Sequence, residues 1–251
     1  MVRTFLVRGM LVGIVAGLLS FSFLKVYGEP QVDRAIAFET QMDEAKAAAE
    51  KAKGMAVPEE QPELVSRPVQ AGLGLFTAVM VYSAAFGGLF GLTFAFAYGR
   101  VPGALSPQAL SALLAVIGFI AIYLVPNLKY PANPPSVGNP ETIGSRTALY
   151  FIMIAISLAA MVGAVALKRL FVAQYGDWNA TLMVGAYYIA VVVAAGLVLP
   201  AVNEVPERFP AVVLWKFRVA SLGAQFIMWT TLGLLFGALT ERALASSRRV
   251  A

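Results

Sequence analysis

The fold is decided first by the stretch FLVRGMLVGIVAGLLSFSFLKVY, residues 5–27. It is apolar over about 20 residues, the length that an α-helix needs to cross the hydrocarbon core of a bilayer. A secretory signal ends in a small-residue cleavage site, and no such site precedes the polar segment that begins at Gly28. The stretch therefore predicts an uncleaved membrane-spanning helix.

Small residues recur at helical spacing within this stretch. Gly9, Gly13 and Gly17 are each four residues apart, so they fall on one face of a helix. A face without side chains lets a neighbouring helix approach closely, and the spacing therefore predicts a packing surface. A similar seam in the next apolar run contains Gly74, Thr77, Ala84, Gly88 and Gly91.

The composition of the whole chain indicates a membrane protein. Of its 251 residues, 59% are hydrophobic and 13% are charged, whereas an average soluble domain carries about 25% charged residues. The chain contains neither Cys nor His, which excludes disulfide frameworks, zinc fingers, thiol nucleophiles and His-based triads. The net charge is +5, but the basic residues are scattered around apolar runs, so nucleic-acid binding is not expected.

Six apolar runs are long enough to span a membrane. They are residues 5–27, 70–98, 108–126, 146–167, 181–200 and 217–240. The third and fifth runs end against Pro126 and Pro200, where a helix is readily terminated. The later connections are too short to form domains of their own. We therefore expect residues 1–251 to form a single membrane domain, an all-α polytopic helix bundle.

The long polar segment, residues 28–69, lies between the first two runs. Up to Pro68 it contains nine acidic and five basic residues; residues 33–53 favour a solvated helix, and residues 54–68 favour a linker. Six spans place both termini on one side of the membrane. Basic residues predominate over acidic ones in the segments on that side, which favours cytoplasmic termini and places the acidic loop outside the cytoplasm.

Oxygen-bearing side chains gather in the loops expected outside the cytoplasm. Besides the acidic loop, these are residues 127–141, rich in Pro and Asn, and residues 203–210. Prolines hold such loops in place, and carboxylate and carbonyl oxygens suit hard or borderline divalent cations. The alternative is that Pro and Asn only shape the turns while charged residues solvate them. The candidate metal ligands of this predicted extracytoplasmic vestibule are Glu29, Asn133, Glu141, Asn203, Glu204 and Glu207.

Two predicted spans carry an arginine on a face with other polar residues. Arg146 and Ser157 lie on one stripe of the fourth run, and Arg218, Ser221 and Gln225 share a face of the sixth. A charge at that depth normally faces the bundle interior and needs a partner, so we expect both arginines to form ion pairs with loop glutamates. Ser157, Ser221 and Gln225 are expected to line an ion pathway.

Four segments carry a family resemblance. They are LKYPANPPSVG at 128–138, ETIGSRTALY at 141–150, LPAVNEVP at 199–206 and LWKFRVASLG at 214–223. These segments resemble the CbtA family, the probable cobalt transporter subunits of bacteria. The resemblance implies a multi-pass subunit of the bacterial inner membrane that imports cobalt for cobalamin synthesis. It also implies a small single-span CbtB partner that brings histidines.

The chain departs from the family in its long first loop. Many members of the family carry a short His-rich stretch there, whereas residues 43–63 of this chain contain Glu and Lys and no His. Three interpretations stay open: the partner supplies imidazole, the oxygen vestibule suffices, or the ion is a different one.

Two functions are compatible with these features. The leading one is a membrane transport subunit whose cargo is cobalt(II) or another divalent cation, with no permanently bound cofactor. The alternative is a non-transporting scaffold or accessory subunit of the lipid bilayer that recruits partners through the acidic loop. An enzyme is not expected, because the chain lacks a P-loop, His, Cys and an evident acid–base pair. An oligomer is compatible with either function.

Overall fold

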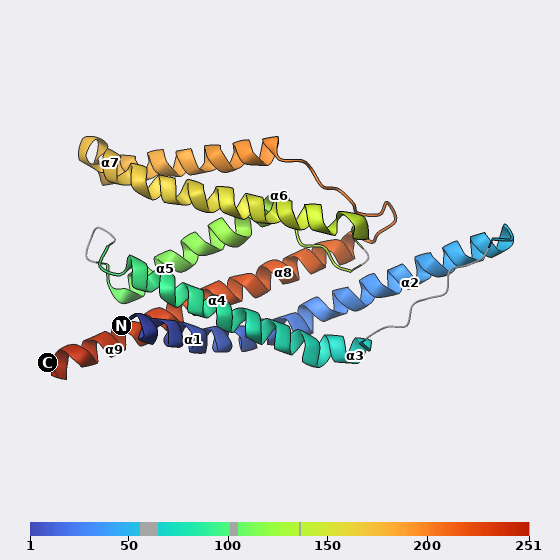
Figure 1. Cartoon of the computed structure of the whole chain (residues 1–251), viewed down its shortest axis with the longest axis horizontal. Coiled ribbons are helices and arrows are strands. Elements are labelled where there is room, and N and C mark those ends of the chain that lie inside the picture. The colour runs from blue at the N-terminus through green and yellow to red at the C-terminus, as the bar shows by residue number, and fades with distance from the viewer. Residues whose placement is uncertain (56–64, 101–104, 136, 251) are drawn as a thin grey trace. The chain divides into compact units, whose positions relative to one another are not determined.

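The computed structural model describes residues 1–55, 65–100, 105–135 and 137–250 (Figure 1). This part of the chain is 86% helical and contains no strand, which confirms the predicted all-α class. In chain order the α-helices are α1 (Val2–Phe23), α2 (Glu29–Ala52), α3 (Arg67–Val69), α4 (Leu75–Ala97), α5 (Pro107–Gly118), α6 (Val125–Lys129), α7 (Ile143–Val198), α8 (Ala211–Thr231) and α9 (Gly237–Val250). Shorter helical turns are the π-helical segments η1 (Leu24–Gly28), η2 (Gln70–Gly74), η3 (Phe119–Leu124) and η5 (Leu232–Phe236) and the 3₁₀ turn η4 (Pro140–Thr142).

The chain forms two compact units. Unit 1 contains Met1–Val116, Asn133–Val137 and Glu207–Ala251. Unit 2 contains Ile117–Ala132 and Gly138–Pro206. The single membrane domain expected over residues 1–251 stays a prediction.

Five helices in the described part of the chain are long and apolar enough to cross a membrane. They are Val2–Ala52, Arg67–Ala97, Pro107–Lys129, Pro140–Val198 and Ala211–Ser246. Six were predicted, and this count was wrong. The difference arises in unit 2, where two predicted runs belong to one helical element, α7, which turns at Gly176.

Helix α7 contains both the fourth and the fifth predicted runs. The loop expected at residues 168–180 is helical, because it contains no proline that would remove a backbone hydrogen bond. Only Gly176 departs from helical geometry, with φ 77° and ψ 167°, and the ribbon folds back there (Figure 1). Side chains from the two halves, such as Ala160 and Tyr188, then share one hydrophobic core.

Pro126 does not end the third predicted run. The helix continues to Lys129 because the π-helical segment η3 precedes Pro126. The wider π turn changes the hydrogen-bond pairing just before Pro126, which lets the helix continue through a residue without an N–H. Pro200 does coincide with a helix end, since α7 stops at Val198.

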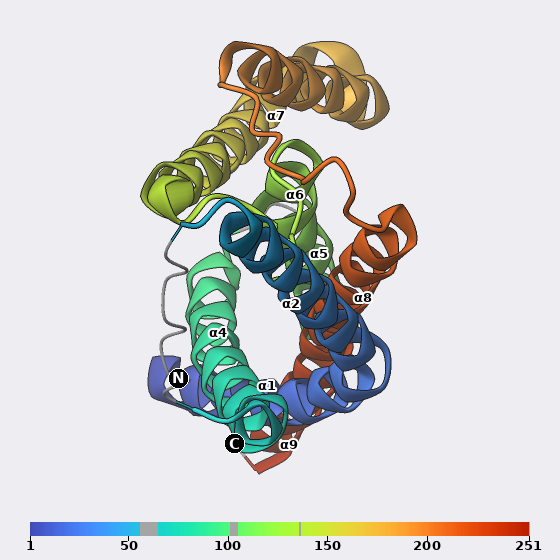
Figure 2. The same ribbon diagram turned by 90° about the vertical axis from the view of Figure 1, so that its right-hand side faces the viewer.

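The glycine face of α1 packs against α4 in unit 1. A Cβ atom built on Gly9 would overlap the carbonyl oxygen of Gly87, and one on Gly13 would overlap that of Ser83. The two backbones are therefore in direct contact, which confirms the predicted packing surface. Helix α1 also contacts α8 (Figure 2), and Ser20 Oγ donates to the carbonyl oxygen of Ala224 at 3.0 Å.

The acidic segment begins as a continuation of the first span. Helix α1 passes through η1 directly into α2, so the chain does not leave the span through a loop. The helix predicted for residues 33–53 is confirmed by α2, which ends at Ala52. Most of the predicted linker, residues 56–64, lies outside the described residues, and the acidic loop as a whole stays a prediction.

Both ends of the chain lie at the same end of unit 1. Arg8 of α1 donates from Nη1 to Thr240 Oγ1 of α9 at 3.1 Å, and Figure 1 shows the N-terminus beside α9. The opposite end of the unit carries α2, α3 and the first turn of α8, where Phe38 and Phe209 form an edge-to-face pair with ring centroids 5.2 Å apart.

Candidate functional site

The six predicted metal ligands divide evenly between the two units. Glu29, Asn133 and Glu207 belong to unit 1, whereas Glu141, Asn203 and Glu204 belong to unit 2. Within the described residues, no group of three or more acidic side chains is placed to hold a metal ion. The common vestibule stays a prediction.

Unit 1 contains a cavity of about 250 Å³ that brings together three of the predicted residues. Its polar lining is Glu29 from α2 and Ser221 and Gln225 from α8. Glu29 is only 8% exposed, so its carboxylate is removed from bulk water. A buried carboxylate next to a hydroxyl and an amide offers three kinds of oxygen to a cation.

The π-helical segment η1 accounts for the position of Glu29. The wider π turn shifts the register of the helix just before Glu29 and places Gly28 and Glu29 on the buried side. Gly28 is closely packed, since an added Cβ would lie 3.1 Å from Cδ2 of Leu24. The remaining lining is apolar, including Leu75 and Phe217.

Glu29 is paired with an arginine that the sequence analysis did not assign. Arg67 of α3 forms an ion pair with Glu29 through Nη2 and Oε2, and its Nε donates to Asp33 Oδ1 at 3.0 Å. Glu29 and Asp33 are one turn apart on α2, so a single guanidinium bridges both carboxylates. The two carboxylates differ in burial, because the Glu29 side chain is 10% exposed and that of Asp33 is 61% exposed.

The α8 side of the cavity is held by contacts with α4 and with the unit 1 segment that begins at Asn133. The Gln225 side chain hydrogen-bonds with the hydroxyl of Tyr82. Further along α8 toward its start, Arg218 donates from Nη2 to Asn133 Oδ1 at 2.9 Å. Asn133 was predicted as a metal ligand and Arg218 as the ion-pair partner of a loop glutamate. In the structure, the side-chain oxygen of Asn133 accepts a hydrogen bond from Arg218.

Unit 2 contains a different carboxylate arrangement, centred on Glu204. Its Oε2 accepts from the backbone N–H of Asn139 at 2.7 Å, and its Oε1 accepts from Thr142 Oγ1 at 2.7 Å. Arg146 Nε lies 3.4 Å from Oε2, at ion-pair distance without hydrogen-bond geometry. The Asn139 N–H lowers the pKa of Glu204 most, followed by the Thr142 hydroxyl and the Arg146 charge.

Arg146 also contacts the loop around Asn139, which donates to Glu204. Its Nη2 donates to the carbonyl oxygen of Asn139 at 3.1 Å. Gly138 has φ 120°, and a Cβ there would overlap the guanidinium of Arg146. Only glycine combines this backbone conformation with this close approach. Both oxygens of Glu204 are therefore engaged by donors of the chain itself.

The remaining predicted residues are separate from both arrangements. Glu141, Asn203 and Glu207 are exposed. Ser157, predicted to line the pathway, is fully buried between the halves of α7 and lies 2.7 Å from the hydroxyl of Tyr188.

A comparison with protein families matches residues 2–241, nearly the whole chain, to CbtA, described as a probable cobalt transporter subunit. The chain belongs to the CbtA family. A search of curated proteins and a search of solved structures found no match. The resemblance seen in the four loop and helix segments is thereby confirmed.

The CbtA description fits the chemistry of the chain at a coarse level. It names cobalt as the cargo and a subunit of a transporter as the role, which implies partner proteins. The apolar helices are of the membrane-spanning type that such a role requires.

Arg67 and Asp33 are the functional candidates that the sequence analysis of this CbtA-family chain missed. The predicted helix began at Asp33, so Glu29 was not recognised as its neighbour one turn earlier. The i, i+4 spacing of the two carboxylates on α2 was the available signal. Arg67, 38 positions after Glu29, left no local signal at all.

Proposed function

We propose that this chain is the membrane-embedded subunit of a divalent-cation importer, with cobalt(II) as its cargo. Family membership supports the cargo and the role, and supply of cobalt for cobalamin synthesis is the use that fits them. The proposed location is the bacterial cytoplasmic membrane with cytoplasmic termini, as the distribution of basic residues predicts.

The observation that carries the proposal is the cavity lined by Glu29, Ser221 and Gln225. A cation that enters it meets one carboxylate and two neutral oxygen donors, and water molecules complete its coordination shell. Cobalt(II) is held moderately by such oxygen ligands and tightly by imidazole or thiolate, neither of which the chain supplies. Moderate binding allows release on the far side.

The Arg67 guanidinium takes the place of the cation when the cavity holds none. A buried carboxylate without a positive partner is costly, and Arg67 removes that cost. The incoming cation displaces Arg67 from Glu29. Asp33, which is exposed on the next turn of α2, keeps Arg67 nearby for its return.

The proposal also includes the predicted extracytoplasmic vestibule and the predicted partner subunit. Exposed oxygen-bearing residues, among them Glu141 and Glu207, form an extracytoplasmic vestibule that attracts cations. A small single-span subunit of the CbtB type supplies the histidines that this chain lacks and captures the ion first. The description of the family as a subunit supports a partner of this kind.

Uptake of radioactive cobalt by cells that express the chain with its native partners tests the proposal. We expect Glu29→Gln to lower the initial rate at least about tenfold, since the cavity loses its charge. Glu44→Gln, an exposed position on the same helix, is the matched control and should leave the rate unchanged. An unchanged rate for Glu29→Gln at equal protein level in the membrane would show that the cavity is not the cation path.

A non-transporting scaffold is the second candidate, and the exposed part of α2 favours it. From Glu39 to Glu44 the helix presents acidic residues to solvent, a surface suited to a basic partner. This candidate predicts co-purification of another protein through α2. It also predicts that deletion of the chain leaves growth on limiting cobalt unaltered, which is the opposite of the transport proposal.

A further inference from the structure

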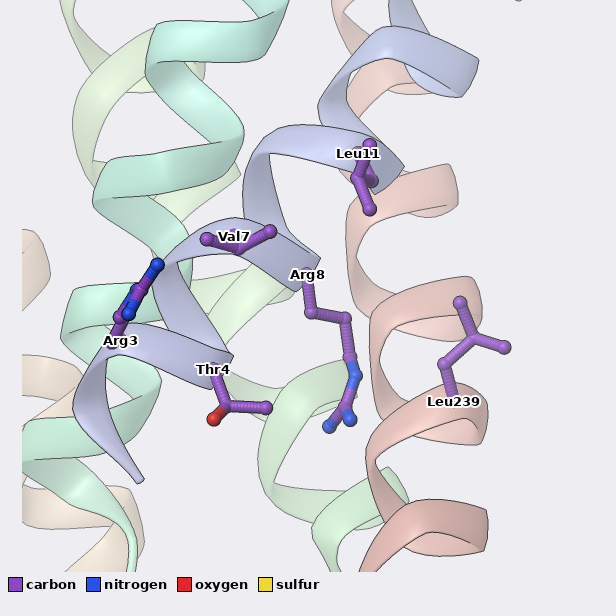
Figure 3. A pocket seen from close by; sticks show the side chains of 6 residues that line it. All are labelled: Arg3, Thr4, Val7, Arg8, Leu11 and Leu239. Carbon is purple, nitrogen blue, oxygen red and sulfur yellow. The ribbon is translucent and has the colours of Figure 1, made fainter.

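A groove lies at the N-terminal end of α1, away from the Glu29 cavity. Its volume is about 650 Å³, and its lining consists of Arg3, Thr4, Val7, Arg8 and Leu11 of α1 and Leu239 of α9 (Figure 3). Figure 3 shows Thr4 and the guanidinium of Arg8 at one end and Leu11 further along α1. The transport proposal uses none of these residues.

The polar end of the groove is built for an anion. Two of the six lining residues are arginines, one has a hydroxyl and none is acidic. Arg8 is fixed by the bond from its Nη1 to Thr240, and a guanidinium carries five N–H donors in all. The start of α1 adds the positive end of a helix dipole, and Met1 at its N-cap makes no side-chain cap.

The other end of the groove is built for hydrocarbon. Val7, Leu11 and Leu239 are aliphatic and 46%, 60% and 39% exposed. From Arg3 to Leu11 the helix rises about 12 Å, which exceeds the roughly 5 to 7 Å headgroup region of one leaflet, so the groove is long enough to reach both headgroups and acyl chains. The two arginines at one end of the groove suit a phosphate, and the aliphatic residues along it suit an acyl chain. The groove therefore matches a phospholipid in both chemistry and length.

We propose that this groove binds an anionic phospholipid. The phosphate lies against the guanidiniums of Arg3 and Arg8 and the hydroxyl of Thr4, and one acyl chain lies along Val7, Leu11 and Leu239. A free phosphate would use only the polar end and would leave the aliphatic wall without a role. The lipid couples the first and last helices of unit 1, since its acyl chain contacts both α1 and α9.

Lipid retention by the purified full chain tests the proposal. The protein is exchanged into detergent with equimolar phosphatidylglycerol and phosphatidylcholine, and retained lipid is measured by native mass spectrometry. We expect a clear preference for phosphatidylglycerol. Arg3→Gln should reduce that preference about fivefold, the effect of one arginine near a membrane surface. Arg100→Gln, an exposed arginine outside the groove, is the control and should retain the full preference.

Two further variants separate the lipid from other occupants. Arg8→Lys keeps the charge at a half-buried position and should keep most of the preference, even if the contact with Thr240 weakens. Leu11→Asn should weaken retention of phosphatidylglycerol but not the binding of glycerol phosphate, which has no acyl chain. Equal retention of the two lipids, an unaltered preference in Arg3→Gln, or glycerol phosphate binding as tightly as the lipid would each overturn the proposal.

Discussion

Glu29 in unit 1 and Glu204 in unit 2 are both carboxylates beside an arginine, yet their surroundings differ in kind. Glu204 accepts from a backbone N–H and a threonine hydroxyl besides facing Arg146, so its oxygens are fixed by the chain. Glu29 faces Arg67 on one side and a cavity on the other. A carboxylate with fixed donors holds a loop, whereas one that adjoins a cavity has room beside it for the ligand proposed above.

Removal of the arginine from each pair tests this contrast most strongly. Arg67→Ala leaves the buried Glu29 carboxylate without a partner, at a cost of about 3 kcal/mol. We expect a lower melting temperature in the presence of a chelator and recovery on addition of cobalt(II), because a cation that binds the folded state stabilises it. Thermal unfolding of the purified chain measures both effects.

The matched variant in unit 2 is Arg146→Ala. It should also lower the melting temperature, since the loop at Asn139 loses the Arg146 Nη2 hydrogen bond. Cobalt(II) should not restore it, because the oxygens of Glu204 remain occupied by Asn139 and Thr142. Recovery of both variants by cobalt(II), or of neither, would remove the distinction between the two sites.

The pH dependence of stability sharpens the comparison on the Glu204 side. The pKa of Glu204 lies below its usual 4.5, chiefly because of the Asn139 N–H, so folding favours the ionised carboxylate. Its contribution is therefore complete above the usual pKa and is lost as pH falls through the lowered value. We expect the melting temperatures of the wild type and Glu204→Gln to differ at pH 7 and to converge as the pH falls through the lowered pKa of Glu204. A constant difference across that range would contradict the assigned role.

The all-helical class and the packing of α1 on α4 were predictable because hydropathy and glycine spacing are local properties of the sequence. The helical geometry of residues 168–180 on either side of Gly176 was not predicted, because the charged residues there resemble a loop. Lys168 and Asp177 in fact form an ion pair at 3.1 Å within α7. The absence of proline was the better guide, because charge does not break a helix whereas proline does.

The candidate site was predictable only in part for a related reason. Ser221 and Gln225 were placed together by their spacing on one helix face, and the structure puts both in one cavity. Glu29 lines the same cavity as Ser221 and Gln225, and it pairs with Arg67. Both contacts join segments that are far apart in the chain. Such contacts depend on tertiary packing, which leaves no periodic signal in the sequence.

Two serines allow a smaller test of the same contrast. Ser157→Ala removes a buried bond to Tyr188 and should cost about 1 kcal/mol of stability without an effect on cobalt uptake. Ser221→Ala removes one oxygen from the cavity and should raise the half-saturating cobalt concentration about fivefold. Uptake assays and thermal unfolding on both variants provide the comparison. The prediction is wrong if Ser157→Ala changes the half-saturating concentration as much as Ser221→Ala does.

The exposed glutamates Glu141 and Glu207 should give the smallest effect. They act on a cation only through the electrostatic field of the surface, which ions screen within about 8 Å at physiological ionic strength. Neutralising both with Glu→Gln should lower initial cobalt uptake about twofold at low ionic strength and not at all at high ionic strength. Glu29→Gln should impair uptake equally under both conditions, because a buried carboxylate is screened little. Salt dependence thus distinguishes attraction toward the membrane surface from coordination inside the cavity, and a salt-independent loss in the double variant would assign these two residues to the path itself.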